Sequence, residues 1–514
     1  MAAPPRSDWI VVGSGFGGSV SALRLAEKGW RVLVLEQGRR FAPEDFPRSN
    51  WRLRRWLWAP RLGCRGPFRI SLLRHLTVFG GVGVGGGSLV YANTLPRPPA
   101  AFFREPGWSE LADWERELEP HYRTAEQMLG ATSVPEPAPA DRALAALARR
   151  LGRAGDWSPT RVGVWFGRPA EQEPDPFFAG EGPPVTGCTR CGGCMIGCRV
   201  GAKNTLDRNY LHLAERRGAE IRPETRVTAV RALPEGGYRV EAGRRVWLAD
   251  RVVLAAGVLG TVRLLLSMRR AADGLPRVSA RAGRDVRTNS EALIGVTTRR
   301  RDLDLSAGVA IGSILRVDER SSLEPVRYPS RSGAFRLLMA PHAPGRNAAV
   351  RLARAAAGLL RNPGRWARAY WTRDWARHTA ILLFMRVHEG RLDLELGRGD
   401  RLRSRVGLGP APTAAIPEAS RLAAEYAEEV EGVVGSLITE TVFGIPSTAH
   451  LLGGATMGAG PEEGVIGPDH QVHGHPGLYV VDGAAVSANP GVNPSLTIAA
   501  LAERAMAAIP ARPT

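Results

Sequence analysis

Three glycines and one acidic residue near the N-terminus have the spacing that binds a dinucleotide. Gly13, Gly15 and Gly18 follow a short apolar run, and Glu36 ends a second run about 20 residues further along. The first glycine permits a tight turn, the second lets the backbone approach a diphosphate, and the third lets helix and strand pack closely. An acid at this place accepts hydrogen bonds from a ribose, which favours FAD or NAD over a 2′-phosphorylated nucleotide.

Four cysteines form a second chemical motif, with gaps of two, two and three residues: Cys188, Cys191, Cys194 and Cys198. Such short gaps do not suit a secreted disulfide framework, so we expect a reducing compartment, the cytoplasm. The spacing matches a ferredoxin-type iron–sulfur run, although Arg199 stands where proline is usual. Zinc and four reduced structural thiols are the alternatives.

Histidine is the side chain best suited to proton transfer near neutral pH, and the chain has ten. His450 lies between apolar residues, shortly before a pair of glycines. This sequence context fits a catalytic base and a core histidine with its hydrogen bonds made inside the protein equally well. His470, His473 and His475 lie in a polar, turn-rich connection, where we expect exposed side chains.

The elements that must position these residues indicate an α/β fold. Residues 9–12 and 31–35 have the pattern of buried strands, and 19–28 that of the helix between them, which makes a βαβ dinucleotide unit. Residues 249–257 predict another buried strand, and 222–230 a strand on the adenine side.

A second glycine-rich run covers residues 80–88 and leads to Asn93. Such density lets a backbone pass against a flat ring or a diphosphate. Near the C-terminus, an apolar run ends at Asp482-Gly483, and a capped helix is predicted from about Ser495 to Ile509.

In these segments the chain resembles the glucose–methanol–choline (GMC) family of flavoenzymes, and within it the bacterial cholesterol-oxidase-like branch. The resemblance implies a Rossmann-like FAD/NAD(P)-binding domain that is discontinuous, and an antiparallel-sheet substrate-binding domain of the GMC type. The resembling segments keep the family's order and include both ends of the chain: 8–36, 79–95, 188–215, 252–260, 283–294 and 450–505.

The resemblance also implies the limits of the two domains. The FAD-binding domain is expected at residues 1–100, 185–290 and 445–514, and the substrate-binding or cap domain at 101–184 and 291–444.

Individual roles follow from the resemblance, residue by residue. His450 would position the substrate hydroxyl and act as the base, and Asn493 would hydrogen-bond the same oxygen or the flavin. The implied cofactor-binding residues are Gly13, Gly15, Gly18 and Glu36 for the ADP half, Val227 for the adenine, Gly87, Ser88 and Asn93 for the diphosphate and ring, and Asp482, Gly483 and Asn493 for the flavin side.

The chain departs from the family pattern in two respects. Leu451 and Ala455 stand where the family commonly has proline and cysteine, a change that affects loop shape rather than proton chemistry. Cholesterol oxidases also use a glutamate base to isomerise the steroid double bond, and no glutamate aligns with it. Glu291 and Glu389 are candidates by region only.

We therefore expect a cytoplasmic FAD-dependent enzyme that oxidises an alcohol to a ketone by hydride transfer to flavin N5. The expected partner is a small-molecule alcohol, sterol-like, with a 3-hydroxysteroid as the substrate. Oxygen is the acceptor if the four thiols are bare, and an external carrier is the acceptor if they hold an iron–sulfur cluster. The alternatives are a GMC sugar or polyol dehydrogenase with an iron–sulfur relay, and an inactive flavoprotein that binds a membrane surface.

Composition and charge limit the remaining classes. With 514 residues, 44% of them hydrophobic, the chain is neither disordered nor a small disulfide scaffold. Its net charge is +19, but lysines occur only at Lys28 and Lys203, and arginines are spread along the chain, as a GC-rich gene would produce. No nucleic-acid-binding motif is present, so we expect no nucleic-acid partner.

Two stretches combine arginine with tryptophan and lack acids. Residues 46–104 contain no Asp or Glu, and residues 351–378 contain one Asp. Trp and Arg together suit the interface of a bilayer, whereas a solvated basic face is the alternative. No apolar stretch of about eighteen residues is present, so we expect at most a peripheral membrane contact.

Overall fold

The apolar runs near the N-terminus form the centre of a mostly parallel sheet in the computed structural model, which describes residues 4–345, 347–388 and 390–513. Strand β1 (Arg6–Val12) lies between β2 (Val32–Leu35) and the long strand β15 (Arg245–Leu254), parallel to both. β12 (Glu220–Arg222) extends the sheet beyond β2, and β26 (Leu478–Val480) pairs with β15. Parallel strands in this order are the Rossmann-like arrangement that was expected.

The expected strand over 222–230 forms only at its two ends. β12 ends at Arg222, and β13 (Ala229–Ala232) begins seven residues later, antiparallel to β14 (Tyr238–Ala242). Between them the chain turns, because Pro223 has no N–H for a ladder and Glu224 has a φ of 51°.

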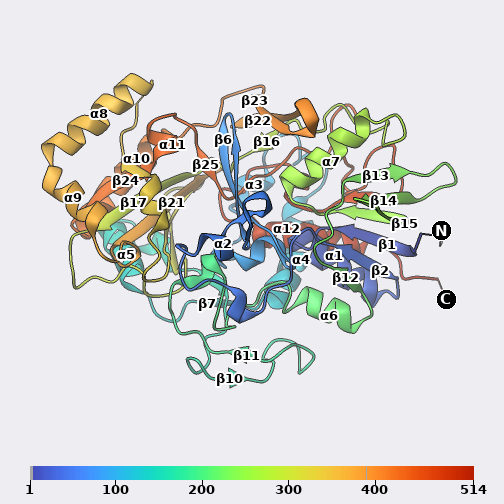
Figure 1. Cartoon of the computed structure of the whole chain (residues 1–514), viewed down its shortest axis with the longest axis horizontal. Coiled ribbons are helices and arrows are strands. Elements are labelled where there is room, and N and C mark those ends of the chain that lie inside the picture. The colour runs from blue at the N-terminus through green and yellow to red at the C-terminus, as the bar shows by residue number, and fades with distance from the viewer. Residues whose placement is uncertain (1–3, 346, 389, 514) are drawn as a thin grey trace.

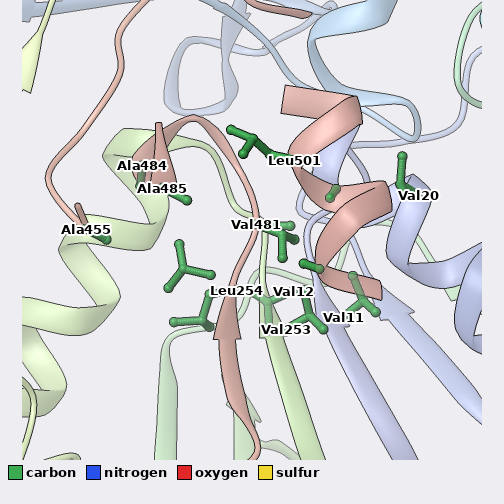
Figure 2. Close-up of a cluster of buried hydrophobic side chains, with 14 of the residues drawn as sticks. Val11, Val12, Val20, Val253, Leu254, Ala455, Val481, Ala484, Ala485 and Leu501 are labelled. Atoms are coloured by element: carbon green, nitrogen blue, oxygen red, sulfur yellow. The ribbon is translucent and has the colours of Figure 1, made fainter. Parts of the chain in front are cut away.

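Helices cover this sheet and close its core. α1 (Phe16–Glu27) and α12 (Ser495–Ala507) pack against each other, so the two ends of the chain share one core. Figure 2 shows side chains of β1 and β15 meeting those of α1 and α12 there. α4 (Trp114–Met128), inside the predicted cap segment, packs on α12, and its Tyr122 hydroxyl lies 3.0 Å from Thr497 Oγ1.

A second large sheet is antiparallel throughout. Its apolar face is covered by α5 (Pro139–Arg150) and α10 (Pro417–Glu429), which supply Leu144 and Leu422 to its core. The strand order is β20 (Met339–Pro341), β24 (Gly432–Leu437), β17 (Ala292–Thr298), β21 (Thr379–Arg386), β19 (Ser321–Val326), β18 (Ser313–Arg316) and β8 (Trp157–Pro159).

A small sheet connects the two large ones. The hairpin of β5 (Phe68–Leu73) and β6 (Leu76–Gly81) runs into the second glycine-rich run. The short strand β25 (Ser447–Thr448) pairs with β6 in parallel and ends two residues before His450. This pairing therefore brings the second glycine run and His450 to the same place.

Two helices project from the edge of the antiparallel sheet. α8 (Ala348–Arg361) and α9 (Pro363–Trp371) follow β20, at the end of the molecule opposite the two termini (Figure 1). Among the helices of the described residues, none is both long enough and apolar enough to cross a membrane.

Candidate active site

The glycine turn after β1 is packed tightly on one side and open on the other. Gly13 has a φ of 100°, and a Cβ there would lie 2.3 Å from the carbonyl oxygen of Ala255, at the end of β15. A Cβ on Gly18 would lie 2.1 Å from Gly13 O, whereas a Cβ on Gly15 would meet open space. Since Gly15 is also the N-cap of α1, the free N–H groups of that helix are available to a diphosphate.

Glu36 follows β2 directly, and its carboxylate lies against this turn. One oxygen accepts hydrogen bonds from Ser14 N (3.1 Å) and Ser14 Oγ (2.8 Å), and the other from Gly38 N (2.8 Å). Burial raises the pKa of this carboxyl group. The loop that carries Val227 meets the same corner, because Thr225 N donates to Glu36 O at 2.7 Å. The residues predicted for ribose and adenine thus lie close together.

The second glycine-rich run contacts the first. A Cβ on Gly86 would lie 2.7 Å from Gly15 Cα. Ser88 is fully buried and holds the run in shape, since its Oγ donates to Gly85 O at 2.7 Å and accepts from Leu206 N at 3.0 Å. Asn93 is also buried, with a φ of 58°, and both polar atoms of its amide lack a hydrogen-bond partner within the described residues.

A cavity of about 360 Å³ begins at these turns and extends to the antiparallel sheet. Phe16 and Gly87 line its dinucleotide end, and His450, Gly483 and Asn493 line its middle. Leu451, one of the departures from the family pattern, also lines it, whereas Ala455 is buried in the core. The far end is lined by apolar and aromatic side chains: Leu293, Ile311, Val326, Tyr328, Phe335 and Leu383.

His450 is paired with a buried carboxylate. Its Nδ1 lies 2.8 Å from Glu291 Oε2, and Glu291 Oε1 accepts a hydrogen bond from Ala449 N at 2.8 Å. The Glu291 side chain is fully buried and that of His450 is 12% exposed. A carboxylate at Nδ1 keeps the proton on that nitrogen, which leaves Nε2 as an acceptor. Glu291, considered by region as an isomerisation base, thus lies behind His450 and not among the described cavity-lining residues.

Asn493 has a carboxyl partner of its own, Glu324 on β19. When the amide nitrogen faces this group, Nδ2 lies 3.0 Å from both carboxylate oxygens. Burial raises the pKa of Glu324 to about 8. A protonated Glu324 can instead donate to Asn493 Oδ1, which turns Nδ2 toward the cavity. Glu324 was not identified from the sequence, because nothing in the residues around it distinguishes it from other positions of a strand.

Asp482, which was predicted to contact the flavin side of the cofactor, directly precedes Gly483 in the cavity wall. One carboxylate oxygen accepts a hydrogen bond from Thr261 Oγ1 (2.5 Å) and the other from Ala484 N (2.8 Å), and burial raises the pKa of Asp482 to about 6. Asp482 thereby ties the loop after β26 to α7 (Val258–Arg270), and the neighbouring Gly483 faces the cavity.

The dinucleotide end of the cavity fits an anionic cofactor. Burial and the nearby guanidinium groups of Arg226 and Arg263 lower the pKa of Arg69, which lines the cavity. A bound diphosphate would relieve the repulsion among these three cations. The open backbone at Gly15 and the unpaired amide of Asn93 would meet its polar atoms, so the residues present fit FAD.

The four clustered cysteines give no support to an iron–sulfur cluster. Within the described residues, no group of three or more His, Cys, Asp or Glu side chains is arranged to hold a metal ion. Cys191 is exposed, whereas Cys194 is buried. Burial raises the pKa of Cys188 to about 11 and that of Cys194 to about 12, so both are neutral thiols at pH 7 when no metal is bound.

Lys203 was missed by sequence reasoning although it is one of two lysines in an arginine-rich chain. It is fully buried, and its ammonium group donates to the carbonyl oxygens of Leu89 (3.3 Å), Tyr91 (2.8 Å) and Cys194 (2.9 Å). Burial lowers its pKa to about 8. Lys203 therefore joins the second glycine run to the cysteine loop. A compact ammonium suits three converging carbonyl oxygens better than a planar guanidinium.

The predicted exposure of two histidines is wrong. His470 and His475 are buried, at 0% and 2% exposure. The turn-rich connection folds back on β26, and His470 Nδ1 lies 2.8 Å from Val480 O. The polar composition of this loop predicted that it lies on the surface. The loop instead packs against the buried strand β26, which removes His470 from solvent.

Comparisons with known proteins find matches to most of the chain. A family model described as FAD dependent oxidoreductase matches residues 8–292, and one described as GMC oxidoreductase matches residues 402–502. A cholesterol oxidase of Mycobacterium tuberculosis (strain ATCC 25618 / H37Rv) is 45% identical over 98% of this chain and 90% of its own. A cholesterol oxidase of Acinetobacter baumannii is 41% identical over 99% of this chain and 95% of its own.

Solved structures show the same fold at low identity. A variant of formate oxidase from Aspergillus oryzae RIB40 superposes with a TM-score of 0.65 and 15% identity over 98% of both chains. Pyridoxine 4-oxidase from Mesorbium loti superposes with a TM-score of 0.59 and 16% identity, also over 98% of both chains.

Proposed function

The chain belongs to the GMC oxidoreductase family and is an FAD-dependent enzyme acting on CH–OH donors, and from this premise we propose that it oxidises the hydroxyl group of a sterol-like alcohol to a ketone. The cavity carries the proposal, because a polar middle with His450 and Asn493 is followed by an apolar end. Such a cavity accepts a large apolar molecule with a single hydroxyl group. The two relatives named as cholesterol oxidases support the same class of substrate.

We assign the hydroxyl proton to His450. The hydrogen bond between Nδ1 and Glu291 holds the imidazole ring in one orientation and one tautomer. The free Nε2 then accepts the hydroxyl proton, directly or through a water molecule. Because Glu291 is fully buried, its negative charge also stabilises the imidazolium that results.

Asn493 has a complementary role. With Glu324 protonated, the amide nitrogen is free to donate to the substrate oxygen, which stabilises the negative charge that develops there. Glu324 is thus a positioning residue, since it acts on the substrate through Asn493.

Bound at the two glycine runs, FAD supplies the acceptor for the hydride that leaves the carbinol carbon. We propose that Gly13, Gly15, Gly18 and Glu36 hold its ADP half, with Val227 at the adenine. Gly87, Ser88 and Asn93 would shape the diphosphate and ring region, and Asp482 and Gly483 the other side. We also propose that the FAD-binding domain comprises residues 1–100, 185–290 and 445–514, and the substrate-binding domain residues 101–184 and 291–444. The proposal includes a cytoplasmic location and a peripheral contact with membranes.

Anaerobic flavin reduction tests the function directly. We expect the flavin absorbance of the purified holoenzyme to bleach on addition of cholesterol, but not of glucose. His450→Gln should retain flavin and lose bleaching by about 10³-fold in rate, because the proton acceptor is gone. His121→Gln, on the outer helix α4, serves as the control. Bleaching by glucose alone, or an unchanged rate in His450→Gln, would contradict the proposal.

A further inference from the structure

Residues 288–291 form a turn between β16 (Val286–Arg287) and β17, at the proposed junction of the two domains. Its two central residues, Asn289 and Ser290, have φ of 59° and 45°, in the left-handed region that glycine favours. Serine rarely adopts such a conformation, so the turn carries backbone strain. Strain of this kind persists only where the surrounding contacts hold it, and in proteins it clusters at functional sites.

One side of this turn holds His450. Besides the contact of Glu291 with Nδ1, the turn reaches the main chain of His450 through Thr448. Thr448 Oγ1 donates to the carbonyl oxygen of Thr288 at 3.1 Å and accepts a hydrogen bond from His450 N at 2.9 Å. Both the imidazole ring and the backbone of His450 are therefore attached to residues 288–291.

The other side of the turn holds the loop that carries Asn493. Asn289 Nδ2 donates to Val492 O at 2.9 Å, and Asn289 Oδ1 accepts from Gly491 N at 2.8 Å. Because one end of the amide only donates and the other only accepts, these two bonds fix which way the side chain faces. Asn289 is 0% exposed, so bulk water does not compete for either bond.

The loop before Asn493 depends on side chains for its position. Gly491 and Val492 are buried but belong to no helix or strand, so their backbone groups need partners elsewhere. Ser322 on β19 supplies one, since its Oγ donates to Gly491 O at 3.1 Å, and Asn289 supplies two. Removing the Asn289 side chain would leave a buried donor and a buried acceptor of this loop unpaired.

We propose that Asn289 is a positioning residue for the oxidation: it holds Asn493 in place relative to His450, so that both side chains meet the same substrate oxygen. Asn289 acts on the substrate through Asn493, since it is not among the described residues that line the cavity. A displacement of about 1 Å at a reacting group lowers a rate by about 10²-fold, so a short, buried link between the two groups matters. This role rests on the proposed function, which assigns both His450 and Asn493 to the substrate hydroxyl.

Asn289→Gly tests this role, because glycine accepts a φ of 59° while both side-chain hydrogen bonds disappear. The variant should keep its flavin and its KM for cholesterol, and kcat should fall about 10²-fold, since Asn493 stabilises charge that develops only in the transition state. In an Asn493→Ala background the same change should lower kcat less than about threefold, because the group that Asn289 positions is already absent.

The matched control is Asn209→Gly. Asn209 is also 0% exposed and also hydrogen-bonds the backbone in both directions, since it donates to Asn204 O at 3.2 Å and accepts from Tyr210 N. It stands at the start of α6 (Tyr210–Arg216) and is not among the described residues that line the cavity. This control should lower the Tm and leave kcat unchanged.

Hydrogen–deuterium exchange of the holoenzyme tests the contact without any turnover. The Gly491 N–H group should exchange about tenfold faster in Asn289→Gly than in the native chain, because it has lost its acceptor. Asn209→Gly should leave this exchange unchanged. Mass spectrometry on peptides that contain Gly491 measures the rates.

The outcomes separate this role from the proposed function. Unchanged exchange at Gly491 would overturn the proposal, and so would losses in kcat that multiply in the double variant of Asn289 and Asn493. Equal losses of kcat in Asn289→Gly and Asn209→Gly would also overturn it, since the effect would then be one of stability alone. If cholesterol fails to bleach the native holoenzyme, the proposed substrate is wrong, and the exchange experiment still decides whether Asn289 holds the loop.

Discussion

The two ends of the cavity are built by different means. At the dinucleotide end, backbone atoms approach one another at glycines, and the nearest groups are backbone atoms of the turns that follow β1 and β15. The middle and the substrate end are formed by side chains. His450 and Asn493 each contact one buried carboxyl group, that of Glu291 and that of Glu324. A substitution at the first end should therefore affect folding or cofactor content as a whole. A substitution at the second should change one kinetic quantity at a time.

The largest effect expected is that of Gly13→Val. A side chain here collides with Ala255 O at 2.3 Å and needs an unfavourable φ of 100°, so we expect a loss of at least about 3 kcal/mol in unfolding free energy and no bound flavin. Gly15→Ala is the matched control: its methyl group meets open space, so the fold should survive while flavin content falls. Denaturant unfolding and flavin absorbance measure the two effects. Full flavin content in Gly13→Val would contradict the claim that the dinucleotide end depends on close backbone packing.

Glu291→Gln tests the partner of His450. The glutamine can keep the hydrogen bond from Ala449 N, but its NH₂ group then faces Nδ1, which moves the imidazole proton to Nε2. We expect kcat to fall roughly 10²-fold with KM and Tm unchanged.

The control for this variant is Glu440→Gln. Burial raises the pKa of Glu440 to about 8, so its carboxyl group is already neutral at pH 7 and the amide replaces it closely. Steady-state kinetics on both variants settles the comparison; equal losses would mean that Glu291 acts only in the fold.

Glu324→Gln tests the partner of Asn493 through its pH dependence. Glu324 is protonated below its pKa of about 8, so in the native enzyme kcat should fall about tenfold between pH 7 and pH 9 as the carboxyl group ionises and captures the amide nitrogen. The variant cannot ionise and should lose this decline.

The same carboxyl group affects stability in a definite direction. Its pKa is about 8 in the folded chain, whereas a freely exposed glutamate has a pKa of 4.5, so the folded state binds the extra proton between these values. Stability from this group should therefore decrease as pH rises from 4.5 to 8, and the Tm of Glu324→Gln should vary less over that range. A Tm profile identical to the native one would argue against a protonated Glu324.

The smallest effect expected is at the apolar end. Val326→Phe adds a ring to the cavity wall, so KM for cholesterol should rise about fivefold, while the rate with a short primary alcohol stays the same. Competition assays with the two alcohols measure the shift. A parallel loss for both substrates would mean that the wall and the polar middle are not independent.

Much of the dinucleotide end could be predicted from the sequence, because it depends on local order. Gly13, Gly15 and Glu36 belong to one βαβ unit, whose residues are near one another along the chain. The partners of the catalytic groups could not be predicted. Glu291 and Glu324 lie 159 and 169 residues before His450 and Asn493, and only the tertiary fold brings each pair together. The burial of His470 was missed for the same reason: it depends on the distant strand β15, which holds β26 in place.

The packing of α12 on α1 has a consequence for synthesis. Helix α1 leaves the ribosome well before the helix that covers it, because α12 begins at Ser495, 468 residues after α1 ends at Glu27. At ordinary translation rates the gap is on the order of tens of seconds, during which apolar side chains of α1 such as Leu23 and Leu25 stay exposed. The nascent chain must therefore keep this face of α1 uncovered until α12 has been made, and a chain that stops before α12 would expose these apolar side chains and be prone to aggregate.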